Sequence, residues 1–357
     1  MAPAPLRAAL LRTLDQIRYV DVARPGDAPA PVARIYGQVE RDFGMLAPPV
    51  ALHAPHPDAL AASWVLLRET LLTPSRTDRA AREAVATAVS LANTCPYCVD
   101  VHGATLEGLV GRGRGLSAGE GAGAAADPRL RGVAAWAEAV ATAEGAAGHR
   151  RPFSAEQLPE LGGVALTFHY LNRMVNVFLG ESPLPRRMPG VVRGRARGML
   201  GRFLRPGARR AHRPGASLDL LPEAPLPAEL AWAAPEPTVA QALARSCAAV
   251  AAAGRQWVPE SVRDLVAEHL AGWAGEPPGL SRAWVEEAVA RIPAQDRTAG
   301  RLALLTAMAS YQVDEATVAG YRRDRPEDAA LVALTAWASL AAARRLGEWL
   351  PTVPSRN

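Results

Sequence analysis

Two of the three cysteines in this chain, Cys95 and Cys98, lie where a helix is predicted to begin, and this placement constrains the fold more than any other feature. Pro96 between them is favoured in the first turn of a helix, where its missing N–H is not needed. Asn93 and Thr94 just before are residue types that cap helix starts. The sequence therefore predicts a helix from about residue 95 to residue 110, where a glycine follows that is typical of a helix end.

His102 shares one face of this predicted helix with the cysteines, because positions 95, 98 and 102 are related as i, i+3 and i+7. A second helix is predicted to open at Asp78, with a stripe of alanines and valines, and it carries Glu83. A turn between the two helices would bring the Glu83 carboxylate back toward the thiols. The sequence thus predicts that two thiols, an imidazole and a carboxylate converge.

These groups fit thiol redox chemistry. A thiol attacks a peroxide or a disulfide as the thiolate, and its ordinary pKa leaves it mostly protonated. The amino end of a helix favours the thiolate, an imidazole can take the proton, and a carboxylate can hold that imidazole in one tautomer. A second cysteine can convert the sulfenic acid into a disulfide before further oxidation. The helix dipole alone favours Cys95, nearer the helix start, as the attacking thiol.

Three other interpretations of the cysteine pair are weaker. A closed zinc site needs a fourth ligand, and Cys247 or His169 would have to supply it from far away in the sequence. Two buried structural cysteines beside a core histidine would leave Glu83 without a role. A structural disulfide is uncommon in a chain with so few cysteines and no secretory signal. We therefore predict a redox-active pair and no metal.

The spacing Glu, eleven residues, Cys, two residues, Cys, three residues, His resembles the signature of the alkylhydroperoxidase D (AhpD)-like branch of the carboxymuconolactone decarboxylase superfamily. Glu83, Cys95, Cys98 and His102 fit it position by position. The resemblance implies an all-helical peroxidase in which Cys98 is oxidised by peroxide, Cys95 resolves it, and Glu83 and His102 relay protons, partly through water. The family often has a histidine just before the second cysteine, where this chain has Tyr97.

A helix predicted over residues 164–179 carries His169, Asn172 and Asn176 at i, i+3 and i+7 among apolar side chains. This polar stripe is either solvated, or hydrogen-bonded in the core, or it forms a wall of the redox pocket together with Tyr97. The remaining histidines show no partner spacing and are predicted to lie on the surface: His53, His56, His149, His212 and His269.

The composition predicts an all-α chain. It is rich in alanine, 49% hydrophobic and only 5% aromatic, and its 357 residues are enough for two domains. We predict two tandem AhpD-like helical domains, at residues 1–181 and 235–357, joined by a linker at residues 182–234. Further helices are predicted over residues 5–22, 31–44, 58–72, 127–144 and 239–253, and a loop over 111–126.

The second domain is predicted to lack a redox site. Its segment 295–311 has the same Asp-Arg start and apolar spacing as residues 77–93. Aligning Asp78 with Asp296 leaves the four positions that correspond to Glu83, Cys95, Cys98 and His102 occupied by Arg301, Val313, Ala316 and Gly320.

The predicted linker is strongly basic. Residues 182–217 contain ten arginines and no acidic residue, whereas the whole chain has a formal charge of +5, so the rest sums to −5. Met199, Leu200, Phe203 and Leu204 could form the apolar face of a membrane-surface helix. No aromatic stacking platform or recognition motif accompanies the arginines, which disfavours nucleic acid. We favour a connector that lies on the acidic body of the protein over a nucleic-acid or membrane partner.

The sequence therefore predicts a peroxide-reducing enzyme or disulfide oxidoreductase without flavin or nicotinamide, since it has no phosphate loop or dinucleotide fingerprint. The resemblance implies a lipoyl- or thioredoxin-like electron donor and a possible homo-oligomer. Without a signal peptide, and with an apolar stretch at 329–343 too short to span a bilayer, the chain is predicted to be cytoplasmic. Two alternatives stay open: a decarboxylase-type lyase acting on a small lactone, and a non-catalytic helical interaction module.

Overall fold

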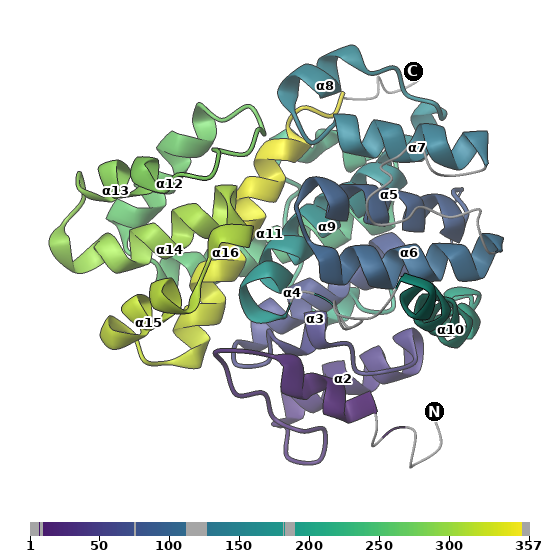
Figure 1. Ribbon diagram of the computed structural model, residues 1–357, viewed down its shortest axis with the longest axis horizontal. Coiled ribbons are helices and arrows are strands. Elements are labelled where there is room, and N and C mark those ends of the chain that lie inside the picture. The colour runs from purple at the N-terminus through teal and green to yellow at the C-terminus, as the bar shows by residue number, and fades with distance from the viewer. Residues whose placement is uncertain are drawn as a thin grey trace.

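The computed structural model describes residue 7 and residues 10–74, 76–111, 127–180, 182 and 190–351, and within these ranges it contains helices and no strands. This confirms the all-α prediction (Figure 1). The first half contains η1 (Arg12–Gln16), α2 (Ala30–Phe43), α3 (Pro48–Ala51), α4 (Pro57–Leu67), the π-helical η2 (Arg68–Leu72), α5 (Arg79–Ala92), α6 (Pro96–Val110), α7 (Pro128–Ala139), α8 (Ala143–Gly148), η4 (Ala155–Gln157) and α9 (Leu158–Phe178).

The remaining helices begin with α10 in the basic segment and continue into the second half. They are α10 (Gly190–Ala208), η5 (Leu218–Leu220), η6 (Ala228–Ala233), α11 (Pro237–Trp257), α12 (Glu260–Ala271), α13 (Ala283–Val289), η7 (Ala294–Asp296), α14 (Arg297–Met308), η8 (Ser310–Gln312), α15 (Glu315–Asp324) and α16 (Asp328–Gly347). In Figure 1 α12, α13, α14 and α15 lie on one side of the molecule, α5, α6, α7 and α10 on the other, and α11 and α16 between them.

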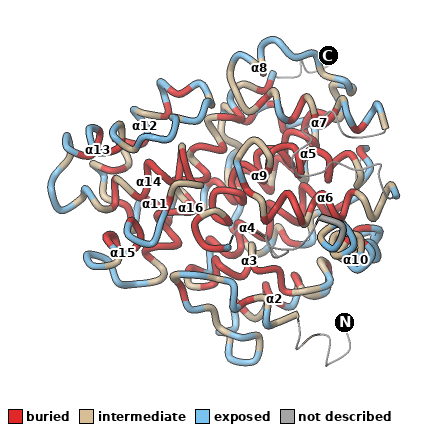
Figure 2. Tube along the Cα trace, viewed as in Figure 1, coloured by how far each residue is buried: buried red, intermediate tan, exposed pale blue. Residues whose placement is uncertain are grey.

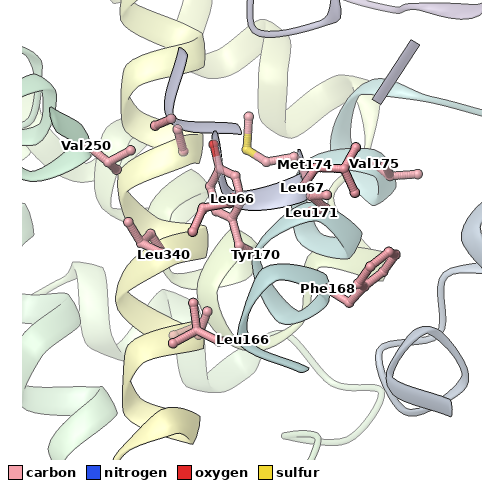
Figure 3. Packing of buried hydrophobic residues seen from close by; sticks show 14 of the residues in the cluster. Leu66, Leu67, Leu166, Phe168, Tyr170, Leu171, Met174, Val175, Val250 and Leu340 are labelled. Carbon is pink, nitrogen blue, oxygen red and sulfur yellow. The ribbon is translucent and has the colours of Figure 1, made fainter. Parts of the chain in front are cut away.

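The long helix α9 lies at the junction of the two halves. It packs against α5 on the first half and against α16 and α14 on the second, and nearly all of its residues are buried (Figure 2). Figure 3 shows Leu166 and Tyr170 of α9 beside Leu340 of α16. Buried side chains of both halves belong to one hydrophobic cluster. The tandem domain boundaries and the duplication stay a prediction.

The apolar helix α16 is longer than the stretch 329–343 seen in the sequence. By length and composition it could cross a membrane, yet 72% of its most apolar window is buried inside the protein. It packs on α9, α11 and α14. Its surroundings are those of the central helix of a globular core.

The basic segment forms a regular helix, α10, that crosses α6 at close range. A Cβ atom at Gly201 would lie 2.4 Å from the carbonyl oxygen of Ala104, and one at Gly108 would lie 2.5 Å from that of Gly201. Only glycine permits this approach of two backbones. α10 is thereby packed directly against α6, the helix that begins between the two cysteines and carries Cys98 (Figure 1).

The predicted helix at 5–22 is wrong beyond residue 16. Residues 17–22 are not helical, and Arg18 instead donates hydrogen bonds to the carboxyl end of α9. The last carbonyl groups of a helix have no partner within the helix. The backbone N–H of Arg18 donates to the Phe178 carbonyl at 2.8 Å, and its guanidinium donates to those of Val177 at 3.2 Å and Leu179 at 2.8 Å. The predicted loop at residues 111–126 lies, apart from Gly111, outside the described residues.

The predicted surface position is wrong for three of the five histidines. His53 is fully buried because both ring nitrogens find partners, Tyr170 Oη at 2.8 Å and the Val50 carbonyl at 3.1 Å. His56 is buried as the cap of α4, where its Nδ1 accepts from the Ala59 N–H at 3.3 Å. His212 is buried near Asp42, with 3.9 Å between its Nδ1 and the carboxylate.

Candidate active site

A three-residue turn joins α5 to α6 and sets the position of the cysteines. Thr94 in this turn has φ 51°, a left-handed conformation that is unusual for a β-branched residue. Cys95 is the N-cap residue of α6, without a side-chain cap bond, and Gly111 ends the helix as predicted. The left-handed turn requires support from the surrounding structure.

This support comes from hydrogen bonds between Asn93, which lies in the turn, and side chains of α9. The Asn93 amide donates to the Oδ1 of Asn172 at 3.0 Å and lies 3.0 Å from Nδ1 of His169. Its side-chain oxygen accepts from Arg173 at 3.1 Å, and its carbonyl accepts from Asn176 at 3.0 Å. Asn93 therefore contacts α9 and does not cap α6, which corrects the capping prediction. The polar stripe of α9 holds the turn that precedes Cys95.

A carboxylate–imidazole pair lies between α5 and α6. The Nδ1 of His102 is 2.7 Å from Oε2 of Glu83, and Nε of Arg79 donates to Oε1 at 2.7 Å. Burial acts to raise the pKa of Glu83, but Arg79 and His102 outweigh it and hold that pKa below its ordinary value. Glu83 is thus an anion that fixes the Nδ1–H tautomer of His102. Arg79 was missed in the sequence, although it stands four residues before Glu83.

Both cysteines of the pair are buried free thiols. A hydrogen bond with Cys95, burial of the thiol and the charge of Cys95 together raise the pKa of Cys98 well above its ordinary value, and a hydrogen bond with Asn172 opposes them. The two thiols are therefore close enough to interact directly. Cys98 stays protonated at neutral pH unless a base takes its proton.

A cavity of about 310 Å³ opens beside this pair. Among the described residues, Tyr97, Cys98 and His102 line it and Cys95 does not. His102 also packs edge-on against Phe168, with 4.5 Å between ring centroids. The other lining residues are mostly apolar: Leu10, Thr13, Gln16, Phe43, Met45, Ala47, Pro48, Pro49, Leu67, Val101, Phe168, Leu171, Leu200, Phe203 and Leu204.

The four residues considered as a pocket wall divide into two sets. Tyr97 lines the cavity, whereas His169, Asn172 and Asn176 are absent from its described lining and contact the turn instead. Phe168 and Leu171 are the residues of α9 that line it. Sequence spacing predicted this helix, which in the structure begins six residues earlier, at Leu158, but the spacing could not show which face of the helix lines the cavity.

The two distant residues considered as zinc ligands have other surroundings. Cys247 is buried on α11, where burial raises its pKa to about 12. His169 contacts Asn93, and burial and the nearby Arg173 lower its pKa well below its ordinary value. Among the described residues, no group of three or more His, Cys, Asp or Glu side chains is arranged to hold a metal ion.

An all-helical fold with a buried Glu–His pair beside two interacting thiols defines the class of AhpD-like proteins. The model of the carboxymuconolactone decarboxylase family matches residues 58–144, which include Glu83, both cysteines and His102. An alkyl hydroperoxide reductase of Mycobacterium tuberculosis is 38% identical over 338 residues, 94% of this chain and 95% of that protein. The chain therefore belongs to the carboxymuconolactone decarboxylase family.

Proposed function

We propose that the protein is a thiol-dependent peroxidase that works through Cys95 and Cys98, with Glu83 and His102 as the proton relay. One observation carries this proposal: Cys98 and His102 line the apolar cavity, while Cys95, which interacts with Cys98, is absent from its described lining. This arrangement supports Cys98 as the thiol that meets the substrate and Cys95 as the one that resolves it.

The reaction takes place in three steps. The Cys98 thiolate attacks the distal oxygen of a hydroperoxide, the O–O bond breaks, and the alkoxide takes a proton and leaves as an alcohol, so that Cys98 becomes a sulfenic acid. The Cys95 thiolate then attacks the Cys98 sulfur and forms a disulfide, and the expelled hydroxide takes up a proton and leaves as water. A dithiol donor finally reduces this disulfide by exchange and is itself oxidised to a disulfide.

Because its pKa is raised, Cys98 needs a base that takes its proton, and the relay of His102 and Glu83 supplies this base. His102 has its Nδ1–H bound to Glu83, so its Nε2 is free to accept a proton. No direct hydrogen bond joins His102 to either thiol among the described residues. A water molecule or the hydroperoxide itself must therefore bridge from Cys98 to His102. Glu83 stabilises the imidazolium that forms.

The proposal also assigns an electron donor, a location and a role to each half of the chain. The electron donor is a lipoyl- or thioredoxin-like dithiol, the location is cytoplasmic, and a homo-oligomer is compatible with the fold. The catalytic domain is residues 1–181, and residues 235–357 act as a scaffold without thiol chemistry. The donor must reach a disulfide whose sulfurs are buried, because both cysteines are buried and α10 packs on the helix α6 that carries Cys98.

Single cysteine variants test the proposal. Cys98→Ser abolishes peroxide consumption, whereas Cys95→Ser allows one turnover and retains a sulfenic acid at Cys98 that mass spectrometry detects after trapping with dimedone. Cys247→Ser is the matched control, because it removes an equally buried thiol on α11 and leaves the rate unchanged. A sulfenic acid on Cys95 in the Cys98→Ser variant would reverse the order of the thiols. Turnover of a small lactone by a protein lacking both thiols would favour the lyase, and intact binding without turnover the interaction module.

A further inference from the structure

The outward face of α10 carries exposed apolar side chains. Val192 is 44% exposed, Met199 68% and Phe203 41%. Positions 192, 199 and 203 are related as i, i+7 and i+11, so these side chains form one stripe along the helix. The other large apolar residue that is exposed in the described part of the chain is Leu280, in the connection between α12 and α13.

Arginines of α10 divide into an inward and an outward set. Arg193 contacts Asp100 at 2.5 Å and Arg197 contacts Glu107 at 3.4 Å, and these pairs hold α10 on α6. Arg195, Arg202 and Arg205 are exposed and form no ion pair with any described residue. By helical periodicity they lie along one side of the apolar stripe.

The exposed stripe continues into the Cys98 cavity. Phe203 belongs to both, because it is partly exposed and also lines the cavity, next to Leu200 and Leu204 from the same helix. An acyl chain that passes α10 would therefore remain in contact with apolar side chains from the surface to Cys98.

We propose that α10 docks on an anionic membrane surface and that the cavity takes up hydroperoxides of membrane lipid acyl chains. A helix with an apolar stripe beside a row of arginines is suited to lie in the headgroup region. Unpaired arginines add attraction to anionic lipids. A second copy of the chain fits less well, because a two-fold contact centred on α10 would place arginines against arginines.

This proposal revises the expectation from composition, in which the basic segment is a connector without a membrane partner. Composition alone could not show that only part of the arginines face the acidic body. The docking surface stands by itself, whereas the substrate class rests on the proposed peroxidase function. The two are tested by separate measurements on the full chain.

The first measurement is co-sedimentation with vesicles of phosphatidylcholine, with or without about one third phosphatidylglycerol. We expect binding to the anionic vesicles only, and weakening by salt. Arg195→Gln/Arg202→Gln/Arg205→Gln should lower the partition coefficient by roughly fivefold per arginine, or about 100-fold together. Met199→Ser should lower it further.

Matched controls exist in the second half of the chain. Arg255, Arg323 and Arg325 are likewise exposed and unpaired among the described residues, and their triple glutamine variant should bind as the original protein does. Leu280→Ser is the control for Met199→Ser. Circular dichroism of each variant verifies that it is folded. Equal binding to neutral vesicles, or no effect of the α10 variant, would overturn the docking surface, as would a variant that merely turns an oligomer into a monomer in ultracentrifugation.

The second measurement compares substrates. The rate of disulfide formation with a phospholipid hydroperoxide in anionic vesicles is divided by the rate with hydrogen peroxide in solution. This ratio should fall at least tenfold in the triple arginine variant of α10 and stay constant in the control triple variant. An unchanged ratio would overturn the substrate class. Sedimentation of the Cys98→Ser variant shows whether docking persists when thiol chemistry is removed, so failure of the peroxidase and failure of docking are distinguishable.

Discussion

The helix pair α5–α6 and the pair α14–α15, which align in sequence, differ sharply in their surroundings. Glu83 on α5 is completely buried between Arg79 and His102. Arg301, at the aligned position on α14, has a side chain that is 31% exposed and forms a bidentate ion pair with Glu286 at 2.7 Å. The same amphipathic spacing thus supports a buried carboxylate–imidazole pair in one place and an ordinary surface ion pair in the other.

The second difference lies in what covers each pair. α6 is covered by α10 and contacts α9, whereas α15 packs mainly on α14 at the edge of the molecule (Figure 1). Ala316, which aligns with Cys98, is exposed. The comparison teaches that helical spacing alone does not make a redox site. Cover by other helices forms the apolar cavity beside Cys98, and burial is one of the causes that raise the pKa of that thiol.

The largest expected effect comes from breaking the relay. Glu83→Gln and His102→Gln should each lower the peroxide rate by about 10²–10⁴-fold, the usual contribution of general acid–base catalysis. Arg301→Gln at the aligned position should leave the rate unchanged. Steady-state peroxide consumption measures the effect, and circular dichroism checks the fold. A loss of helicity that accounts for the loss of rate would mean that Glu83 and His102 are structural.

The pH dependence of the oxidation rate tests whether the pKa of Cys98 is raised in the covered site. Because the pKa of Cys98 is raised, its thiolate fraction grows with pH throughout the neutral range, by up to about tenfold per pH unit below that pKa. Asn172→Leu removes a hydrogen bond that lowers this pKa, so the profile should move to higher pH. Stopped-flow oxidation of the Cys95→Ser variant reports the profile. A rate independent of pH from 6 to 9 would show that the thiolate is already formed.

The close packing of α10 on α6 can be disturbed by substituting one glycine of α10. Gly201→Ala places a Cβ against the Ala104 carbonyl and should destabilise the protein by about 1–3 kcal/mol, as overpacking does. Gly320→Ala, on the uncovered helix α15, meets only the flexible Arg323 side chain at 3.7 Å and should be nearly neutral. Chemical denaturation compares the two variants. Equal stability of both would mean that α10 does not pack tightly on α6.

The dependence of stability on pH concerns His53, a histidine of the first half. Burial lowers the pKa of His53 to about 3, so the folded protein excludes a proton that the unfolded chain binds. Stability should therefore fall as pH drops from about 6.5 toward 3, by at most about 1.4 kcal/mol per pH unit. His53→Gln should reduce this slope, whereas His269→Asn, at a partly exposed position, should not. Urea unfolding at several pH values measures how the free energy of unfolding changes with pH. Identical slopes in the two variants would show that His53 is not the group responsible.

Local sequence determined the elements and their chemistry. The start of α6 follows from Pro96, its end from Gly111, and the shared face of Cys98 and His102 from helical periodicity. The approach of Glu83 followed from joining two helices by a short turn. These features depend on residues near one another in the chain, where backbone geometry fixes the distances.

Only the tertiary structure decided which groups are buried and what they meet. Asn93 contacts α9, some 80 residues later, rather than capping its own helix. His53 is buried because Tyr170 reaches it across the core, and Arg18 binds the end of α9. α10 covers the site because two glycines allow its backbone to approach α6. Such contacts join distant segments, and their free energy depends on packing and desolvation that no local pattern contains.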